Sequence, residues 1–348
     1  MSGKCQSIHH EDVNGGNLIS RVRYANSSMS IDLVPKPTFE PTVRDPYGRE
    51  VRSLRLSVTQ RCDLACSHCH REGQSESVVE MTPDEMENLV RIAVSLGVRK
   101  VKLTGGEPLL REDILEIVSR ISPLVAEVSM TTNGSQLSRL ADPLKHAGLR
   151  RVNVSLHTLD PDLYACICGK DLSGLVVDGI SSAVRAGLNP VKVNMVVLKD
   201  TNEDHINSMI DFCARSGAVL QLIEFEADRE SSNGGQFARR FFSLKPTEEM
   251  LARQSNETSV NELHRRKRYR IPADGGTVVV EVVRPMHNTE FCSNCSRIRM
   301  SSDGRLKPCL LDTGGEVDVL TPMRSGMTNH QLRGLFLKAI ENRKPYWS

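Results

Sequence analysis

Six of the ten cysteines fall into two groups of three, and their spacing indicates metal chemistry. The first group is Cys62-x3-Cys66-x2-Cys69, and the second is Cys292-x2-Cys295-x13-Cys309. In a long chain without an export signal, cysteines are more often metal ligands or buried thiols than disulfide partners. A four-iron cluster normally takes four thiolates, so three leave one iron open to an external ligand. We therefore expect two iron–sulfur clusters, one in each group.

Zinc is the alternative metal at both places. His68 or His70 could be a fourth zinc ligand in the first group, and His287 could be one in the second. Colourless protein with stoichiometric zinc and no iron would favour a zinc-binding module that is not an enzyme.

The four remaining cysteines do not form a third group. Cys213 lies in an apolar helical pattern, so we expect it in the core. For Cys166 and Cys168 a loop or packing role is favoured over metal ligation. Cys5 lies in a polar leader, residues 1–45, that we expect to be poorly ordered.

Six short β-branched runs alternate with helical patterns between residues 50 and 226. The runs are Leu54–Thr59, Lys100–Leu103, Glu127–Thr131, Arg151–Leu156, Val191–Leu198 and Val219–Phe225. The first helix is marked by Thr82 as N-cap, Pro83 in the first turn and Glu85 completing a capping box. Such alternation predicts an α/β fold with a parallel sheet, here a partial TIM-like barrel of six β/α units over residues 46–230.

The pattern changes after a predicted loop at Ser231–Gln236. A short helix near Pro246–Ala252 and strands near Tyr269–Ile271 and Thr277–Val283 come next, and Thr328 with Gln331 begins a final helix. We expect residues 240–348 to form a smaller C-terminal α+β domain that contains the second cluster.

Polar and glycine-rich segments follow the predicted strands, where parallel α/β folds place functional residues. These are Cys62–Cys69, Thr104–Pro108, Thr131–Gly134 and Ser155. Gly105 and Gly106 would let the backbone approach a ligand closely, although an ordinary turn has the same composition. Arg297 and Arg299 lie two apart in a predicted strand, so both face one side, where they could bind a phosphate or a purine edge.

Two motifs carry a family resemblance. Cys-x3-Cys-x2-Cys after the first strand, together with Gly105-Gly-Glu-Pro108, resembles the radical S-adenosylmethionine (SAM) enzymes. Phe291-Cys-Ser-Asn-Cys-Ser-Arg-Ile-Arg-Met-Ser-Ser-Asp-Gly304 resembles the C-terminal motif of the GTP 3′,8-cyclase family of molybdenum cofactor biosynthesis, and this resemblance spans roughly residues 45 to 345. It implies two [4Fe-4S] clusters and a SAM-derived 5′-deoxyadenosyl radical that removes the 3′ hydrogen of GTP, whose C3′ radical then attacks C8.

The resemblance also implies residue roles, with no side chain acting as a catalytic acid or base. The SAM contacts would be His68, Gly105, Gly106, Glu107 and Ser155. The GTP contacts would be Arg55, Lys102, Thr131, Lys192, Arg297 and Arg299. The implied partners are GTP, a reductant for the cluster, the cyclic pyranopterin monophosphate synthase that takes the product, and a second copy in a homodimer.

Several positions depart from the bacterial pattern. His68 replaces an aromatic residue, Lys102 and Gln221 replace arginines, and Glu226 replaces a methionine. The final Lys-Pro-Tyr-Trp-Ser lacks the bacterial Gly-Gly tail, and Cys-His-Arg-Glu-Gly at 69–73 resembles archaeal members.

Composition and charge argue against several other classes of function. The formal charge is only +2, so nothing in the balance demands nucleic acid, and the basic run 264–270 is more typical of a solvated strand edge. No P-loop, signal-like segment or membrane-length apolar run is evident, so we expect a cytoplasmic enzyme. A radical peptide-modifying maturase is the rival enzyme, although such enzymes usually carry more auxiliary cysteines.

Overall fold

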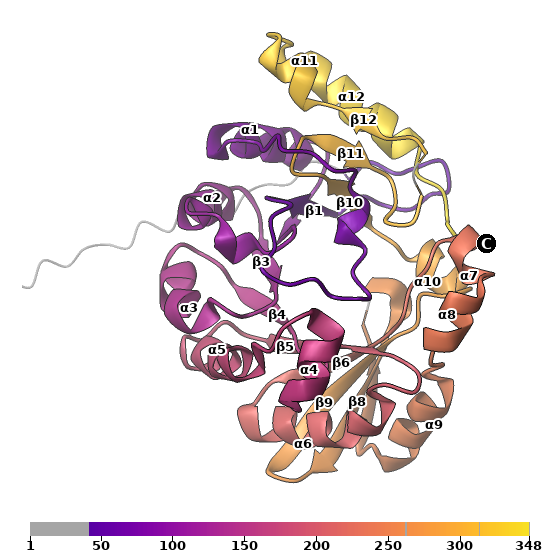
Figure 1. The fold of residues 1–348 in the computed structure, drawn as a ribbon. Coiled ribbons are helices and arrows are strands. Elements are labelled where there is room, and N and C mark those ends of the chain that lie inside the picture. The colour runs from indigo at the N-terminus through magenta and orange to yellow at the C-terminus, as the bar shows by residue number, and fades with distance from the viewer. Residues whose placement is uncertain (1–41, 262, 313, 348) are drawn as a thin grey trace, which may run out of the picture. The chain divides into compact units, whose positions relative to one another are not determined.

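The computed structural model describes residues 42–261, 263–312 and 314–347. Most of the expected leader, with Cys5, lies outside these residues. The described strands form one sheet of 12 strands in the order β12-β11-β10-β1-β2-β3-β4-β5-β6-β9-β8-β7. The sheet curves into a barrel that its strands do not close, because β7 and β12 remain edges (Figure 1).

The six predicted β/α strands are the parallel centre of this sheet. They are β1 (Ser53–Ser57), β2 (Lys100–Thr104), β3 (Glu127–Thr132), β4 (Arg151–Ser155), β5 (Val191–Val197) and β6 (Val219–Glu224). Each pairs in parallel with the next along the chain. The expected partial barrel is therefore confirmed.

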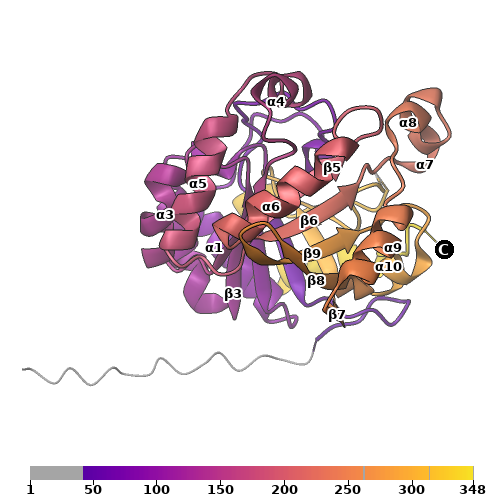
Figure 2. The ribbon, with the colours of Figure 1, turned by 90° about the horizontal axis from the view of Figure 1, so that it is seen from below.

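Helices cover the outer face of these strands (Figures 1 and 2). They are α1 (Pro83–Val94), α2 (Ile114–Ile121), α3 (Leu137–His146), α4 (Pro161–Cys168), α5 (Ser173–Arg185) and α6 (Ile206–Ser216). The predicted capping box of α1 is present, since Thr82 accepts from the Glu85 amide and Glu85 accepts from the Thr82 amide. No helix in the described part of the chain is long and apolar enough to cross a membrane.

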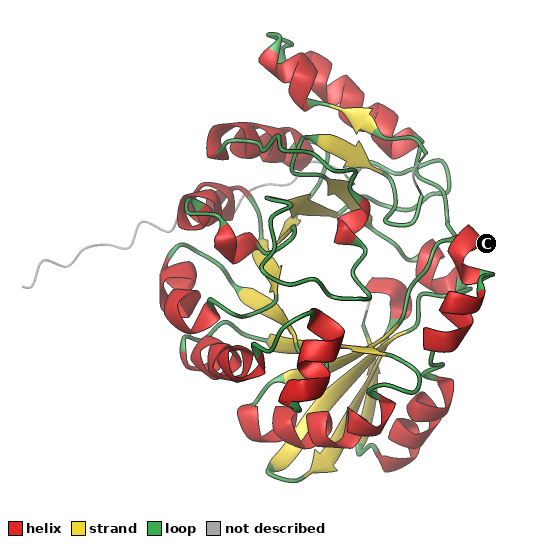
Figure 3. Cartoon of the chain, viewed as in Figure 1, coloured by secondary structure: helices red, strands yellow, loops and turns green. Residues whose placement is uncertain are grey.

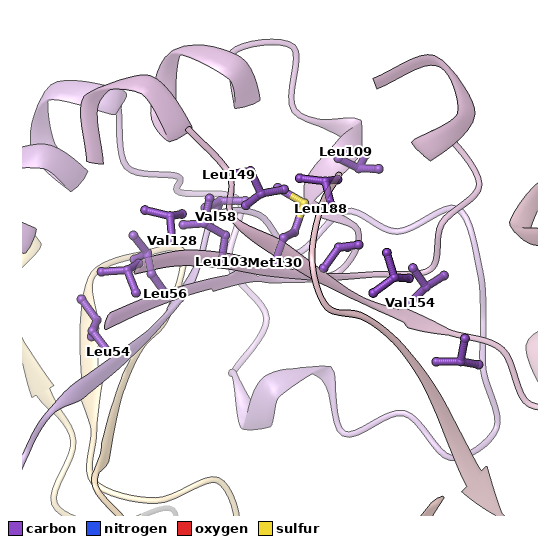
Figure 4. Packing of buried hydrophobic residues seen from close by; sticks show 14 of the residues in the cluster. Leu54, Leu56, Val58, Leu103, Leu109, Val128, Met130, Leu149, Val154 and Leu188 are labelled. Atoms are coloured by element: carbon purple, nitrogen blue, oxygen red, sulfur yellow. The ribbon is translucent and has the colours of Figure 1, made fainter. Parts of the chain in front are cut away.

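The core lies between the helices and the outward-facing side chains of the strands. Leu54 and Leu56 of β1 and Val128 and Met130 of β3 are fully or almost fully buried there (Figure 4). Burying one such side chain stabilises the fold by about 1.5–3 kcal/mol. Because side chains alternate along a strand, Arg55 and Ser129 between these residues must face the inside of the barrel.

The last third of the chain extends both edges of the parallel sheet. At one edge β9 (Gly276–Val283) pairs in parallel with β6 and continues antiparallel through β8 (Lys267–Ala273) to β7 (Glu257–Val260). At the other, β10 (Arg297–Met300) pairs in parallel with β1, followed antiparallel by β11 (Arg305–Lys307) and β12 (Val317–Asp318). One C-terminal segment thus supplies strands on either side of the barrel opening.

The remaining α-helices belong to this last third, as the labels of Figure 1 show, and Figure 3 draws all helices in red. They are α7 (Arg229–Ser232), α8 (Gly235–Arg240), α9 (Lys245–Gln254), α10 (Thr289–Ser293), α11 (Leu320–Arg324) and α12 (Asn329–Glu341). The predicted loop at Ser231–Gln236 was wrong, because α7 ends and α8 begins within it. Asp228 caps α7 by accepting from the Ser231 amide, a start signal that the sequence reading did not use.

Candidate functional site

The inward side chains of the barrel line one cavity of about 1290 Å³. Strand pairing places Arg299, Arg55 and Lys102 side by side on β10, β1 and β2. Asn153 and Lys192 are likewise paired on β4 and β5, and Thr131 completes the predicted nucleotide contacts that line the cavity with Arg297. The structure therefore brings all six predicted GTP-binding side chains into one cavity.

Cationic side chains outnumber acidic ones among the residues that line the cavity. Burial lowers the pKa of Arg55 to about 10 and holds that of Lys102 well below its usual range, and neighbouring arginines add to both shifts. The Lys102 ammonium has the Asn153 amide oxygen at 3.0 Å as a partner instead of a carboxylate. Thr131 Oγ1 and the Nε atoms of Arg55 and Arg297 are buried without a hydrogen-bond partner. Such a cavity is suited to an anionic, oxygen-rich ligand.

Two carboxylates do reach these cations. Glu72, three residues after Cys69, lies 2.6 Å from Arg299 NH1 and 3.4 Å from Arg55 NH1. Burial alone would raise the pKa of Glu72, but the two arginines outweigh it and lower the pKa to about 2. On the far side, Glu281 pairs with Lys192 and, at 3.3 Å, with Arg266. These two carboxylates hold their cationic partners in position by ion pairs. Cationic side chains still outnumber acidic ones in the cavity lining.

The first triad lies in the loop that leaves the carboxyl end of β1. All three thiols are free, with Cys62 and Cys69 exposed and Cys66 half-buried. Asp63 anchors the loop by accepting from Asn133 Nδ2 at 2.6 Å and Ser135 Oγ at 3.0 Å, and Arg240 donates to the Ser67 carbonyl and hydroxyl at 2.7 Å each. The loop is thus held by the end of β3 and by α8.

The predicted SAM contacts surround this loop. A Cβ on Gly106 would lie 2.2 Å from the Arg61 carbonyl, so the glycine permits close approach of this loop's own backbone. Glu107 is buried and accepts from Thr132 Oγ1 and the Asn133 amide at 2.6 Å, so its carboxylate fixes the turn after β3. Ser155 lies half-buried at the end of β4.

The His68 ring packs edge-on against His157, with ring centroids 4.4 Å apart. Burial, with His157 and Arg240 nearby, lowers its pKa well below the usual range, so the ring is neutral at pH 7. Its Nδ1 is buried without a partner. A neutral ring beside the first triad is able to contact a nucleoside. The same ring also packs against His157 within the protein.

The second triad opens directly on the cavity, since Cys292, Cys295 and Cys309 all line it. Burial would raise the pKa of Cys295, but Arg297 and Arg343 outweigh it and lower the pKa to about 7. The Trp347 amide lies 3.4 Å from Cys292 Sγ. The lowered pKa of Cys295 and the hydrogen bond to Cys292 both suit thiolates that ligate iron.

Backbone anchors hold the second triad in place. Arg343 NH2 donates to the Cys295 carbonyl at 2.7 Å, and Arg49 NH1 donates to the Cys292 carbonyl at 3.0 Å. Asp45 accepts from both guanidiniums, at 2.8 Å from Arg49 and 2.9 Å from Arg343. Residue 45, the last of the expected leader, therefore belongs to the folded structure.

The two triads lie toward opposite ends of the paired strands β1 and β10. The first follows the carboxyl end of β1, and Cys292 and Cys295 precede the amino end of the parallel neighbour β10. Glu72, which follows the first triad, contacts Arg55 of β1 and Arg299 of β10 on the inner face of the sheet. A ligand in the cavity would therefore contact the second triad directly, and the paired strands lead from it toward the first.

The arrangement of the donors bears on the zinc alternative. Within residues 42–261, 263–312 and 314–347, no three His, Cys, Asp or Glu side chains converge on a point that could hold one metal ion. His287 packs on Trp347 instead, with ring centroids 4.2 Å apart. Zinc draws its ligands closely around one atom, whereas a cubane separates its thiolates by irons and sulfides.

Comparison with known proteins assigns both halves of the chain. The Radical SAM superfamily matches residues 56–213, and the Molybdenum Cofactor Synthesis C family matches residues 218–348. A probable GTP 3′,8-cyclase of Thermococcus kodakarensis is 52% identical over 304 residues, which cover 87% of this chain and 99% of the relative. That of Pyrococcus abyssi is 48% identical over the same shares. The chain belongs to the GTP 3′,8-cyclase family.

Fold similarity extends beyond the cyclases. Streptococcus suis SuiB, crystallised with its precursor peptide SuiA, superposes with a TM-score of 0.57 at 16% identity, covering 76% of this chain and 61% of SuiB. At that identity the match shows a shared fold only. As a radical SAM protein, this cyclase-family member uses a [4Fe-4S] cluster and SAM.

Several residues that line the cavity of this cyclase-family member were not predicted from the sequence. The basic run was read as a solvated edge, which is wrong for His264 and Arg266: His264 is 4% exposed, and both line the cavity. Arg266 NH1 lies 3.2 Å from Gln221 Oε1, so a guanidinium is present where Gln221 replaces the expected arginine. Asn153 and Asn194 were also missed, although their alternation with valines could have revealed them.

Two of the three described cysteines outside the triads are buried packing residues. Cys213 is fully buried in the core, as predicted. Cys166 and Cys168 lie at the end of α4, where Cys168 is buried and hydrogen-bonds the Cys66 thiol while Cys166 is exposed. A loop position for this pair was wrong, whereas packing is confirmed for Cys168.

Proposed function

We propose that this protein is a GTP 3′,8-cyclase, which converts GTP to (8S)-3′,8-cyclo-7,8-dihydroguanosine 5′-triphosphate in the first step of molybdenum cofactor biosynthesis. The carrying observation is the cavity beside the second triad, whose charged lining residues are mostly cationic. A nucleoside triphosphate is the size and charge that such a cavity accommodates. The full-length relatives of the same name support the assignment.

The first triad would hold the SAM-binding cluster, with Cys62, Cys66 and Cys69 as ligands. When bound, this cluster supplies the electron that splits SAM into methionine and the 5′-deoxyadenosyl radical that removes the 3′ hydrogen. Around it, His68, Gly105, Gly106, Glu107 and Ser155 would fix SAM. The glycines and Glu107 act through the backbone turns that they set.

The second triad would hold a further [4Fe-4S] cluster through Cys292, Cys295 and Cys309. Its proposed role is to bind the purine, because the triad opens on the cavity next to Arg297. Arg55, Lys102, Thr131, Lys192 and Arg299 would then contact the ribose and triphosphate. Their cations orient the substrate and stabilise its charge, and no protein acid or base is needed for hydrogen abstraction.

We also propose partners outside the chain. A cytoplasmic reductant would feed the first cluster, and the cyclic pyranopterin monophosphate synthase would consume the product. A homodimer is proposed from the family alone. No role for a membrane or for nucleic acid is proposed, and His264, Arg266 and Arg268 of the basic run line the cavity.

Anaerobically reconstituted, reduced protein should form 5′-deoxyadenosine and the cyclised nucleotide from SAM and GTP in equal amounts. Deoxyadenosine without loss of GTP would mean a different substrate. Arg297→Ala should slow GTP turnover while sparing uncoupled SAM cleavage, because Arg297 lies at the second triad. Arg305→Ala, on the exposed side of β11, is the matched control and should leave both unchanged.

A further inference from the structure

A buried histidine connects the two edge regions of the sheet. His264 lies in the connection between β7 and β8 at one edge of the sheet and is 4% exposed. Its Nε2 lies 2.7 Å from Arg297 NH2, and Arg297 belongs to β10 near the other edge. Its Nδ1 lies 3.0 Å from the Phe291 carbonyl, and its ring packs on the Phe291 ring with centroids 3.7 Å apart.

These partners fix the state of the imidazole. A carbonyl oxygen only accepts, so Nδ1 must carry the hydrogen and donate it to Phe291. A guanidinium only donates, so Nε2 must be unprotonated and accept from Arg297. Burial, together with Arg297 and Arg266 nearby, lowers the pKa of His264 well below its usual range. The ring is therefore a neutral acceptor aimed at Arg297.

The backbone around the ring is held in an unusual conformation. His264 has φ 60° and Arg265 has φ 53°, values that non-glycine residues rarely adopt. Such conformations persist where the surroundings impose them, and they gather at functional sites. The His264 amide also donates to the Asn294 carbonyl at 3.4 Å, inside the second triad. The strained turn thus brings the ring to Arg297 instead of leaving it in solvent.

We propose that His264 is a positioning residue that orients the Arg297 guanidinium toward the nucleotide. The proposal rests on the function proposed above, in which Arg297 contacts the base. With one NH2 hydrogen bound to His264, the guanidinium cannot rotate freely, so its other donors keep one direction in the cavity. A hydrogen bond to a charged group strengthens such a site about tenfold or more.

Two variants separate positioning from folding. His264→Asn tolerates the left-handed backbone and can still donate to the Phe291 carbonyl, but it is too short to accept from Arg297. His264→Gln carries an amide oxygen about where Nε2 lies, so it can restore that acceptor. Iron content, thermal stability, GTP binding by equilibrium dialysis without reductant, and steady-state kinetics would be measured for each reconstituted holoenzyme.

We expect His264→Asn to weaken GTP binding and raise KM about tenfold, with kcat, uncoupled SAM cleavage and iron content unchanged. His264→Gln should return binding to within about threefold of wild type. Wild-type affinity in His264→Asn, equal loss in both variants, or joint loss of iron and stability would overturn the proposal. Wild-type protein that binds GTP without consuming it would refute the proposed function alone, and absence of binding would refute both.

Discussion

The buried charges that anchor the second triad allow a quantitative prediction. Asp45 has a fully buried side chain, and it accepts from Arg49 and from Arg343, which is 1% exposed. In Asp45→Asn one carboxylate oxygen becomes an NH2 group that only donates. In either orientation it faces donors, the two guanidiniums at Oδ2 or the Tyr47 and Arg49 amides at Oδ1, and the negative charge is lost. Removing one partner of a buried ion pair leaves uncompensated charge and costs about 3–5 kcal/mol.

Urea unfolding of the apoprotein should therefore show a free energy of unfolding lower by about 4 kcal/mol. The melting temperature should fall by roughly 10 °C. Because Arg49 and Arg343 also donate to the carbonyls of Cys292 and Cys295, the reconstituted variant should lose iron from the second triad before the first. Mössbauer or EPR spectra of the two clusters would follow this loss.

Asp274→Asn is the matched control. That carboxylate is 78% exposed and pairs with Arg215, which is 51% exposed, so its removal should cost no more than about 1 kcal/mol. If Asp45→Asn changed stability as little as the control and kept its iron, the buried charges would have no net effect. The reasoning about the second triad's anchors would then be refuted.

Three further predictions concern the first triad and the cavity. The pKa of Glu72 falls from 4.5 to about 2 on folding, so its contribution of about 3 kcal/mol is present above pH 4.5 and is lost as pH falls toward 2. Apoprotein carrying Glu72→Gln should thus unfold more easily than wild type at pH 7 in urea, and a gap that did not narrow below pH 4.5 would contradict this. Gly106→Ala should impair SAM binding and first-cluster assembly, because its Cβ would lie 2.2 Å from the Arg61 carbonyl; Gly334→Ala, in an open position on α12, is the control, and normal assembly in Gly106→Ala would count against the packing argument. Cys292→Ala should keep about half of the iron and still cleave SAM without consuming GTP, and full iron content would exclude a second cluster.

Local patterns were enough to predict the six β/α strands, and the family resemblance supplied six residues of the cavity. A capping box is satisfied within four residues, so Thr82 and Glu85 marked the start of α1. The two-residue spacing of Arg297 and Arg299 placed both on one face of a strand, and both line the cavity. The cysteine spacings and the motifs around them led to the family, which the relatives then confirmed.

Residues whose partners are distant in the chain were not predictable in this way. Glu72 meets Arg299 across 227 positions, and Arg343 meets the Cys295 carbonyl across 48. A charged residue in a basic or acidic run reads as solvated until its partner is known. His264 was misjudged for this reason, since the sequence shows its basic neighbours but not the Phe291 carbonyl that accepts from its Nδ1 and the Arg297 guanidinium that donates to its Nε2.

The sequence by itself determined two sets of three thiols, the order of the six β/α units and the cationic side chains that alternate along them. These depend on spacing and on backbone periodicity, which are local. Only the tertiary structure decided that the C-terminal strands extend both edges of the sheet and that the triads lie toward opposite ends of the paired strands β1 and β10. Strand pairing and buried ion pairs join segments hundreds of residues apart, and their free energy exists only once the chain has folded and excluded water from them.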